Sequence, residues 1–196
     1  MSRIKSLCLG IALVASGVVA ANAGTVDIDF VESAGGVSMS GSGDITLGSG
    51  LSLLFTTSNS GLHFVNPAAG GFGMGAVASI DAYEFAATTS FGTSVSTLLA
   101  PGTGDPFGIA FNSRDPVLLV PENYTTGTPL AFTLEAPGSS FASLGITPTD
   151  VTITAGANAI NLNFSTAVVP LPAGVVLLMT ALAGLGLTGA RRKSAA

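Results

Sequence analysis

The side chains of this chain that could do chemistry are mainly carboxylates. Asp27 and Asp29 are two positions apart, a spacing that places both on one face of a β-strand. Two acids held at a suitable separation can hydrolyse a glycosidic bond, and loop acids with backbone carbonyls can hold calcium. Neither an EF-hand spacing nor a glycine-rich calcium repeat occurs, so the sequence favours solvated acids. The other candidate acids fall in or beside turn-rich segments: Asp81, Glu84, Asp105 and Asp115.

Histidine and cysteine add little to a catalytic site. His63 is the only histidine, and no Gly-x-Ser-x-Gly motif accompanies it, so a serine-type triad is disfavoured. The single cysteine, Cys8, lies in an N-terminal apolar run that we expect to be removed. One imidazole without thiolates cannot close a zinc shell. We therefore predict no catalytic residue, no cofactor, no metal site and no enzymatic activity.

Charge divides the chain into three segments. All 11 acids lie in residues 24–167, whereas five of the six Lys and Arg residues lie in the two ends. Because only Arg114 opposes the acids, residues 24–167 carry a formal charge of −10. A surface of that sign repels phosphate backbones and anionic headgroups, which disfavours nucleic-acid binding. Divalent cations and basic partners remain compatible with it.

The elements that would position these acids are short strands. In "TVDIDFVE", Val26, Ile28 and Phe30 alternate with acids, as in a half-buried strand. The same alternation occurs in "DITLGSGLSLLF", "FGIAF", "LAFTL", "VTI" and "INLNF", with turn clusters between them. No sustained helical period and no βαβ spacing are present. We predict an all-β body, an antiparallel β-sandwich or jelly-roll-like fold.

The middle of the body has the weakest pattern. In "DITLGSGLSLLF", Leu51, Leu53 and Phe55 share one face of an expected half-buried strand. "GLHFVN" then predicts a strand with His63 at a loop edge. Residues 61–87 include Gly-x-Gly-x-x-Ala at 73–78, a loose dinucleotide-loop match without the strand and helix that such a loop needs. We interpret it as a glycine-rich loop between strands.

The N-terminus has the three parts of a secretory signal peptide. Two basic residues precede the apolar run 7–19, and small residues follow at Ala21 and Ala23, before Gly24. The run is short for a membrane span. We predict a signal peptide at residues 1–23, cut by signal peptidase between Ala23 and Gly24.

The C-terminus, residues 168–196, has its own three-part pattern. Pro170 and Pro172 keep "VPLPA" extended, as a protease cleft requires. The uncharged run 174–190 can just span a membrane as a helix at about 1.5 Å per residue. Basic residues belong on the cytoplasmic side, which places the body outside the inner membrane. The predicted basic, stop-transfer end, 191–193, consists of Arg191, Arg192 and Lys193.

These three parts together resemble the VPLPA-CTERM form of the PEP-CTERM sorting domain, found on exported proteins of Gram-negative bacteria. The resemblance implies that an exosortase, a membrane-embedded cysteine peptidase, recognises the segment and cuts near its motif. "VPENYTTGTPLAFTLEAPGSSFASLGITPTD" also resembles a segment common in bodies attached to such tails, except for the "TDVTITAG" that follows it. Those bodies have no established activity that the resemblance could imply for this chain.

The residues of the predicted sorting motif are Val169, Pro170, Leu171, Pro172 and Ala173.

The sequence therefore predicts three regions: signal peptide 1–23, secreted β-rich body 24–167 and sorting signal 168–196. We expect a structural or interaction protein, anchored at the inner membrane with its body in the periplasm, then delivered to the cell surface or extracellular matrix. Its expected partners are signal peptidase, an exosortase-type peptidase, the membrane before processing, and exopolysaccharide, with no nucleic acid. The alternatives are an extracellular carbohydrate- or calcium-binding module and, third, a secreted hydrolase.

Overall fold

The computed structural model describes residues 23–48, 50–58, 63–86, 88–112 and 115–167. The signal peptide up to residue 22 lies outside the described residues. So do the sorting motif 169–173, the predicted membrane helix 174–190 and the basic end 191–193. Among the residues that are described, no helix is long and apolar enough to cross a membrane.

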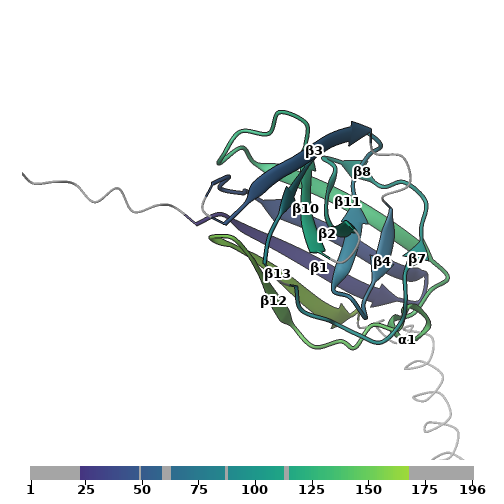
Figure 1. The fold of residues 1–196 in the computed structure, drawn as a ribbon. Helices are drawn as coiled ribbons and strands as arrows, with labels where there is room; N and C mark the ends of the chain where they lie inside the picture. Colours follow the sequence, from purple (N-terminus) through teal and green to yellow (C-terminus); the bar gives the residue numbers. More distant parts are fainter. Residues whose placement is uncertain (1–22, 49, 59–62, 87, 113–114, 168–196) are drawn as a thin grey trace, which may run out of the picture.

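The prediction of an all-β body is confirmed, because strands in two sheets make up most of the described chain. Figure 1 shows both sheets. The six-stranded first sheet runs, edge to edge, β12 (Val151–Ala155), β13 (Asn158–Thr166), β1 (Thr25–Ser33), β2 (Gly36–Gly43), β11 (Leu130–Pro137) and β8 (Thr103–Gly104). The seven-stranded second sheet runs β3 (Ser52–Ser58), β6 (Ser79–Glu84), β10 (Asp115–Pro121), β9 (Phe107–Asn112), β5 (Gly71–Met74), β4 (Phe64–Asn66) and β7 (Thr97–Leu98).

One strand pair departs from the antiparallel arrangement. β1 and β13 are parallel neighbours, with Thr25 opposite Ala159 and Glu32 opposite Thr166 (Figure 1). The first described strand and the last therefore run side by side in the same direction. As a result, the start of β1 and the end of β13 lie at opposite ends of the first sheet.

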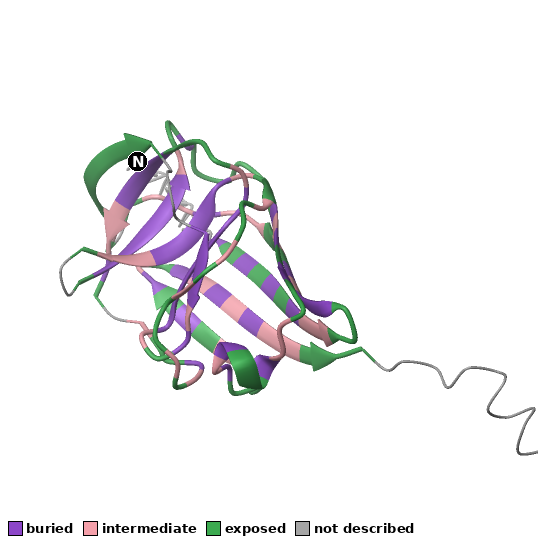
Figure 2. Ribbon diagram, turned by 90° about the vertical axis from the view of Figure 1, so that its right-hand side faces the viewer, coloured by how far each residue is buried: buried purple, intermediate pink, exposed green. Residues whose placement is uncertain are grey.

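The core lies between the sheets and is rich in phenylalanine. Val26, Ile28 and Phe30 are buried, as the alternation in β1 predicts, and Figure 2 shows the striped pattern of buried and exposed residues along these strands. Phe107 of the second sheet stacks on Phe132 of the first, with ring centroids 4.8 Å apart. Such contacts join the two layers and add to the energy of apolar burial.

The expected burial of Leu53 and Phe55 is wrong. β3 is an edge strand whose seven residues are all exposed. Residues 44–47, expected to continue in a strand, are irregular, although Ile45 is fully buried. Alternation alone does not reveal whether a strand lies at an edge, because that depends on its neighbours in the sheet.

Two further features of the fold differ from the sequence interpretation. Part of the expected glycine-rich loop is β5, in which Phe72 and Met74 are buried. Glycine has a low strand propensity and hides the alternation there. A one-turn helix, α1 (Phe141–Leu144), also lies between β11 and β12. It begins with a capping box at Ser140. Four residues are too few to produce a helical period.

Candidate functional site

The outer face of the first sheet brings Asp27 and Asp29 beside two asparagines. Asn161 Nδ2 donates a hydrogen bond to Asp27 Oδ1 over 2.8 Å, and Asn163 Nδ2 donates to Asp29 Oδ1 over 3.1 Å. Both pairs follow from the parallel register of β1 with β13. The prediction that the two acids share one exposed strand face is confirmed.

Hydroxyl groups extend this polar surface on both sides of the acids. Ser42 and Ser40 of β2 lie opposite Asp27 and Asp29 and are exposed. Beyond β2, Thr133 of β11 shares a hydrogen bond of 2.8 Å with Thr103 of β8. We call this surface the Asp–Asn face; it consists of Asp27, Asp29, Ser40, Ser42, Thr103, Thr133, Thr152, Asn161 and Asn163.

At its β12 edge the Asp–Asn face meets an open hollow. Thr152 Oγ1 donates to Asn161 Oδ1 over 2.9 Å and also lines this hollow of about 490 Å³. A smaller hollow of about 150 Å³ lies over Asp27, Asp29 and the β2 serines. The smaller one is below the roughly 300–1,000 Å³ of a small-molecule pocket. The residues around the larger one are small: Gly50, Ala86, Thr88, Thr89, Thr152, Thr154 and Gly156.

The chemistry of the Asp–Asn face is hydrogen bonding along an extended surface. It presents carboxylates, amides and hydroxyls in rows across the strands and contains no aromatic or basic side chain. The described residues hold all 11 acids of the chain and none of its Lys or Arg residues. A long neutral chain of hydroxyl groups fits such a surface better than a nucleic acid or an anionic polymer does.

The other predicted acids do not join this face. Asp81 is buried, and its two carboxylate oxygens accept from Thr56 Oγ1 (2.5 Å) and from the Asn123 backbone N–H (2.9 Å). It therefore joins β6 to β3 and to the turn after β10. Asp105 Oδ2 accepts from the backbone N–H of Ala131, also a structural contact.

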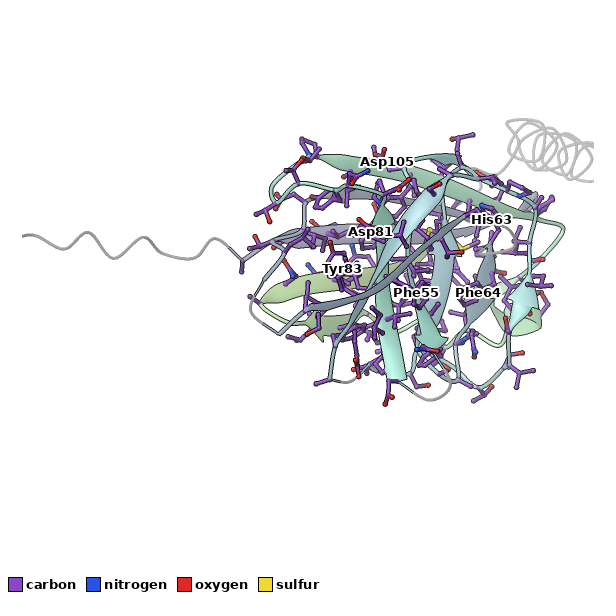
Figure 3. The ribbon with its side chains drawn as sticks, turned by 45° about the horizontal axis from the view of Figure 1, so that its top comes forward. Phe55, His63, Phe64, Asp81, Tyr83 and Asp105 are labelled. Carbon is purple, nitrogen blue, oxygen red and sulfur yellow. The ribbon has the colours of Figure 1, made fainter. Side chains whose placement is uncertain are left out.

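Asp81 also affects a neighbouring phenol. Burial raises the pKa of Tyr83 above its ordinary value of 10.0, and the negative charge of Asp81 raises it further. Figure 3 shows Asp81 and Tyr83 close together. Within the described ranges, no group of three or more His, Cys, Asp or Glu side chains is placed to hold a metal ion.

His63 directly precedes β4, at the loop edge that the sequence predicts (Figure 3). The residue is buried, and its Nε2 atom has no hydrogen-bond partner among the described residues. Within the described part of the chain, no carboxylate or hydroxyl lies within hydrogen-bond distance of Nε2 to form a catalytic pair. The imidazole is a packed side chain in this structure.

Of the predicted signal peptidase site, Ala23 and Gly24 are described and Ala21 is not. Ala23 is exposed, whereas Gly24 is buried and its backbone N–H donates to Asn158 Oδ1 over 3.1 Å. The first buried residue of the described chain is therefore the one that follows the predicted cut.

No family model, curated protein or solved structure matches this chain.

Sequence reasoning missed the asparagine half of the Asp–Asn face. The pattern "INLNF" does place Asn161 and Asn163 on the polar side of a strand. The pattern does not show which residues these asparagines bind, because Asp27, the partner of Asn161, is 134 positions away. No local pattern predicts a parallel pairing over that separation.

Proposed function

We propose that this chain is an exported protein that is processed at both ends, and that its β-rich body serves as a structural or interaction component of a bacterial cell surface or extracellular matrix. The observation that carries the proposal is the extent of the folded body. Among the described residues, the first strand begins at Thr25 and the last ends at Thr166. The predicted signal peptidase cut after Ala23 and the motif 169–173 therefore flank the strands without interrupting any of them.

The parallel pairing of β1 with β13 supports the same proposal. Because Thr25 and Thr166 lie at opposite ends of the first sheet, the two signals are attached at separate places. Either signal can be cut without removing any of the described strands. In this proposal, the segment 174–190 holds the body on the periplasmic side of the inner membrane of a Gram-negative cell until an exosortase cuts near Val169–Ala173.

Comparison of a host strain with one that lacks the exosortase-type peptidase tests the proposal. We expect the deletion strain to keep full-length, membrane-bound protein, whereas the parent strain releases a body without residues 174–190. Intact mass measurement identifies both products. A double variant, Pro170→Ala with Pro172→Ala, should accumulate like the deletion, because the extended motif is lost. A mature protein that retains 174–190 in the parent strain would contradict the proposal.

The Asp–Asn face favours a second, compatible function: binding of a neutral exopolysaccharide. Its rows of carboxylates, amides and hydroxyls offer donors and acceptors to sugar hydroxyl groups over the six strands of the first sheet. The hollow of about 490 Å³ beside Thr152 and Thr154 would accept a saccharide unit at one edge.

Calorimetric titration of the mature protein with the host's exopolysaccharide tests this function. We expect binding that weakens about tenfold or more when Asn161 and Asn163 are both changed to Ala, because each loses a donor and leaves a carboxylate unpaired. Asn112→Ala, an exposed asparagine outside the face, is the matched control. Heat with calcium alone would favour the calcium-binding alternative, and release of new reducing ends would favour the hydrolase.

A further inference from the structure

The polar side chains of the Asp–Asn face lie in two rows that cross the strands of the first sheet. The strand registers define the rows, because residues paired across neighbouring strands lie side by side on one face. The first row crosses β12, β13, β1 and β2 and consists of Thr152, Asn161, Asp27 and Ser42. The second row crosses β13, β1, β2, β11 and β8 and consists of Asn163, Asp29, Ser40, Thr133 and Thr103.

Hydrogen bonds fix many of these side chains within their rows. Four such bonds each run from one strand to the next: Thr152 to Asn161, Asn161 to Asp27, Asn163 to Asp29 and Thr103 to Thr133. The side chains are therefore positioned before a ligand arrives, which lowers the entropic cost of binding it.

The face is longer across the strands than along them. Neighbouring strands lie about 4.8 Å apart, so a row that crosses five strands covers about 19 Å, and the two rows lie about 7 Å apart. Apolar side chains limit the face along the strands. Val31 is the next outward residue after Asp29 on β1, and Ala159 is the one before Asn161 on β13.

The two hollows of this surface follow the rows. The smaller one, of about 150 Å³, is lined by Asp27 and Ser42 of the first row and by Asp29 and Ser40 of the second, so it lies between the rows. The larger one, of about 490 Å³, is lined by Thr152, the last member of the first row. A ligand that lies between the rows therefore leads across the strands toward the larger hollow.

The repeat of the rows matches one class of polymer. A chain that crosses the strands meets new polar groups about every 4.8 Å, which is close to the length that one sugar unit adds to an extended, β-1,4-linked chain. Such a chain carries hydroxyl groups along both of its edges, one edge for each row. An α-1,4-linked chain of the same sugar coils, so its hydroxyl groups leave the rows after a few units.

Charge decides against an acidic polymer of the same shape. Asp27 and Asp29 lie within the two rows, and the described body holds 11 acids and no Lys or Arg. A uronic acid unit over the rows would place its carboxylate close to theirs, and like charges repel. The occupant that fits both the spacing and the charge is uncharged.

We propose that the Asp–Asn face binds an extended, uncharged, β-1,4-linked polysaccharide that lies across the strands between the two rows, about one sugar unit per strand. This inference rests on the polysaccharide binding proposed above and adds the linkage and the direction of the bound chain. One end of the bound segment lies at Thr152, beside the larger hollow, and the other lies at Thr103 on β8.

Calorimetric titration of the mature protein with two glucose hexamers tests the linkage. Cellohexaose is β-1,4-linked and extended, whereas maltohexaose is α-1,4-linked and coiled; the two have the same composition and no charge. We expect cellohexaose to bind about tenfold or more tightly than maltohexaose, because only the extended chain meets both rows along its length. The proposal is overturned if maltohexaose binds as tightly as cellohexaose, or if neither hexamer binds.

Alanine variants test the direction of the bound chain. Thr103 and Thr152 lie at opposite edges of the first sheet, so Thr103→Ala combined with Thr152→Ala should weaken cellohexaose binding about tenfold. Ser165→Ala is the matched control, because Ser165 is an exposed hydroxyl on the same face, two residues beyond Asn163 along β13. A chain that ran along the strands would pass over it. The control should leave the affinity unchanged.

The outcomes separate this inference from the function on which it rests. Weaker binding in Ser165→Ala, with unchanged binding in the double threonine variant, would overturn the crossing direction and leave polysaccharide binding intact. Binding of the host's exopolysaccharide without binding of cellohexaose would overturn the linkage alone. If neither the host's exopolysaccharide nor cellohexaose binds, both this inference and polysaccharide binding by the face are wrong. Urea denaturation midpoints of the variants distinguish lost affinity from lost folding.

Discussion

Asn158 Oδ1 accepts a hydrogen bond from the backbone N–H of Gly24, 134 residues earlier in the chain. The same oxygen accepts from Thr46 N at 2.7 Å, while Asn158 Nδ2 donates to Thr46 O and Ala155 O at 3.0 and 2.9 Å. The buried amide therefore uses both of its donors and both acceptor positions. It joins the start of β1, the segment after β2 and the turn before β13.

We expect Asn158→Asp to destabilise the body by about 3 kcal/mol or more. The variant keeps an acceptor for Gly24 and Thr46 but places a carboxylate oxygen against two carbonyl oxygens, without water. Urea denaturation measures the loss, with Asn112→Asp, at an exposed asparagine, as the control. Acidification should restore part of the stability, because the protonated acid regains one donor. Equal denaturation midpoints for the two variants would contradict this role of Asn158.

The sequence predicts features of this fold that depend on local alternation. The burial of β1 is predicted correctly because every second residue of this strand faces the core. The alternation therefore indicates that Ile28 and Phe30 are buried. The exposure of β3 is not predicted, because Leu53 and Phe55 alternate in the sequence but lie at an open edge, where the strand register shifts between them. The acid half of the Asp–Asn face was accessible from the spacing of Asp27 and Asp29. Its asparagine half depends on a parallel pairing that only the complete fold sets.

Alkaline pH should weaken the folded state through its two tyrosines. Burial raises the pKa of Tyr124 above 10.0; the hydrogen bond from the Ile45 N–H opposes this, and the charges of Asp44 and Asp105 add to it. The pKa of Tyr83 is raised as well. In the unfolded chain both phenols ionise near pH 10. The folded state therefore keeps its phenolic protons to a higher pH than the unfolded chain does. The stability that these two shifts contribute is fully present below about pH 10 and is lost as the pH rises through the folded pKa values.

Tyrosinate absorbance measures this directly, because the chain has no tryptophan and only two tyrosines. We expect both phenols of the folded protein to ionise above the pH at which the urea-unfolded chain does. Tyr124→Phe leaves a single transition, which assigns the other one. Coincident titration curves for the folded and unfolded protein would contradict the expected shift.

Gly41 should tolerate no side chain, because it leaves room for the aromatic contact between the sheets. A Cβ atom at Gly41 would overlap the ring of Phe132, which stacks on Phe107 across the core. We expect Gly41→Val to cost about 2–3 kcal/mol, since the ring has to leave its position in a closely packed interior. Urea denaturation compares it with Ser42→Val, the exposed neighbour on the same strand. Similar stabilities of the two variants would show that Phe132 repacks freely.

Gly24 follows the predicted signal peptidase cut and also binds Asn158 in the fold. One substitution distinguishes its effect on the cut from its effect on the fold. A Cβ atom there would lie 2.6 Å from Asn158 Oδ1 and 2.6 Å from the backbone oxygen of Asp44. The small-residue pattern of signal peptidase resides in Ala21 and Ala23, so Gly24→Ala should still be cut after Ala23. The mature variant should nevertheless be about 1–3 kcal/mol less stable, because Asn158 Oδ1 is held by its hydrogen bonds to Gly24 and Thr46 and the oxygen of Asp44 belongs to the backbone.

N-terminal sequencing and urea denaturation of the secreted protein measure the two effects, with Thr25→Ala, at an exposed position, as the control. A mature N-terminus other than residue 24 in the unmodified protein would contradict the predicted cut. Unchanged stability of Gly24→Ala would instead show that Asn158 does not hold the first residue of the mature chain. The position of the cut and the packing of Gly24 against Asn158 are therefore tested by separate measurements. They are separate because signal peptidase cuts the unfolded segment before Asn158 can bind Gly24.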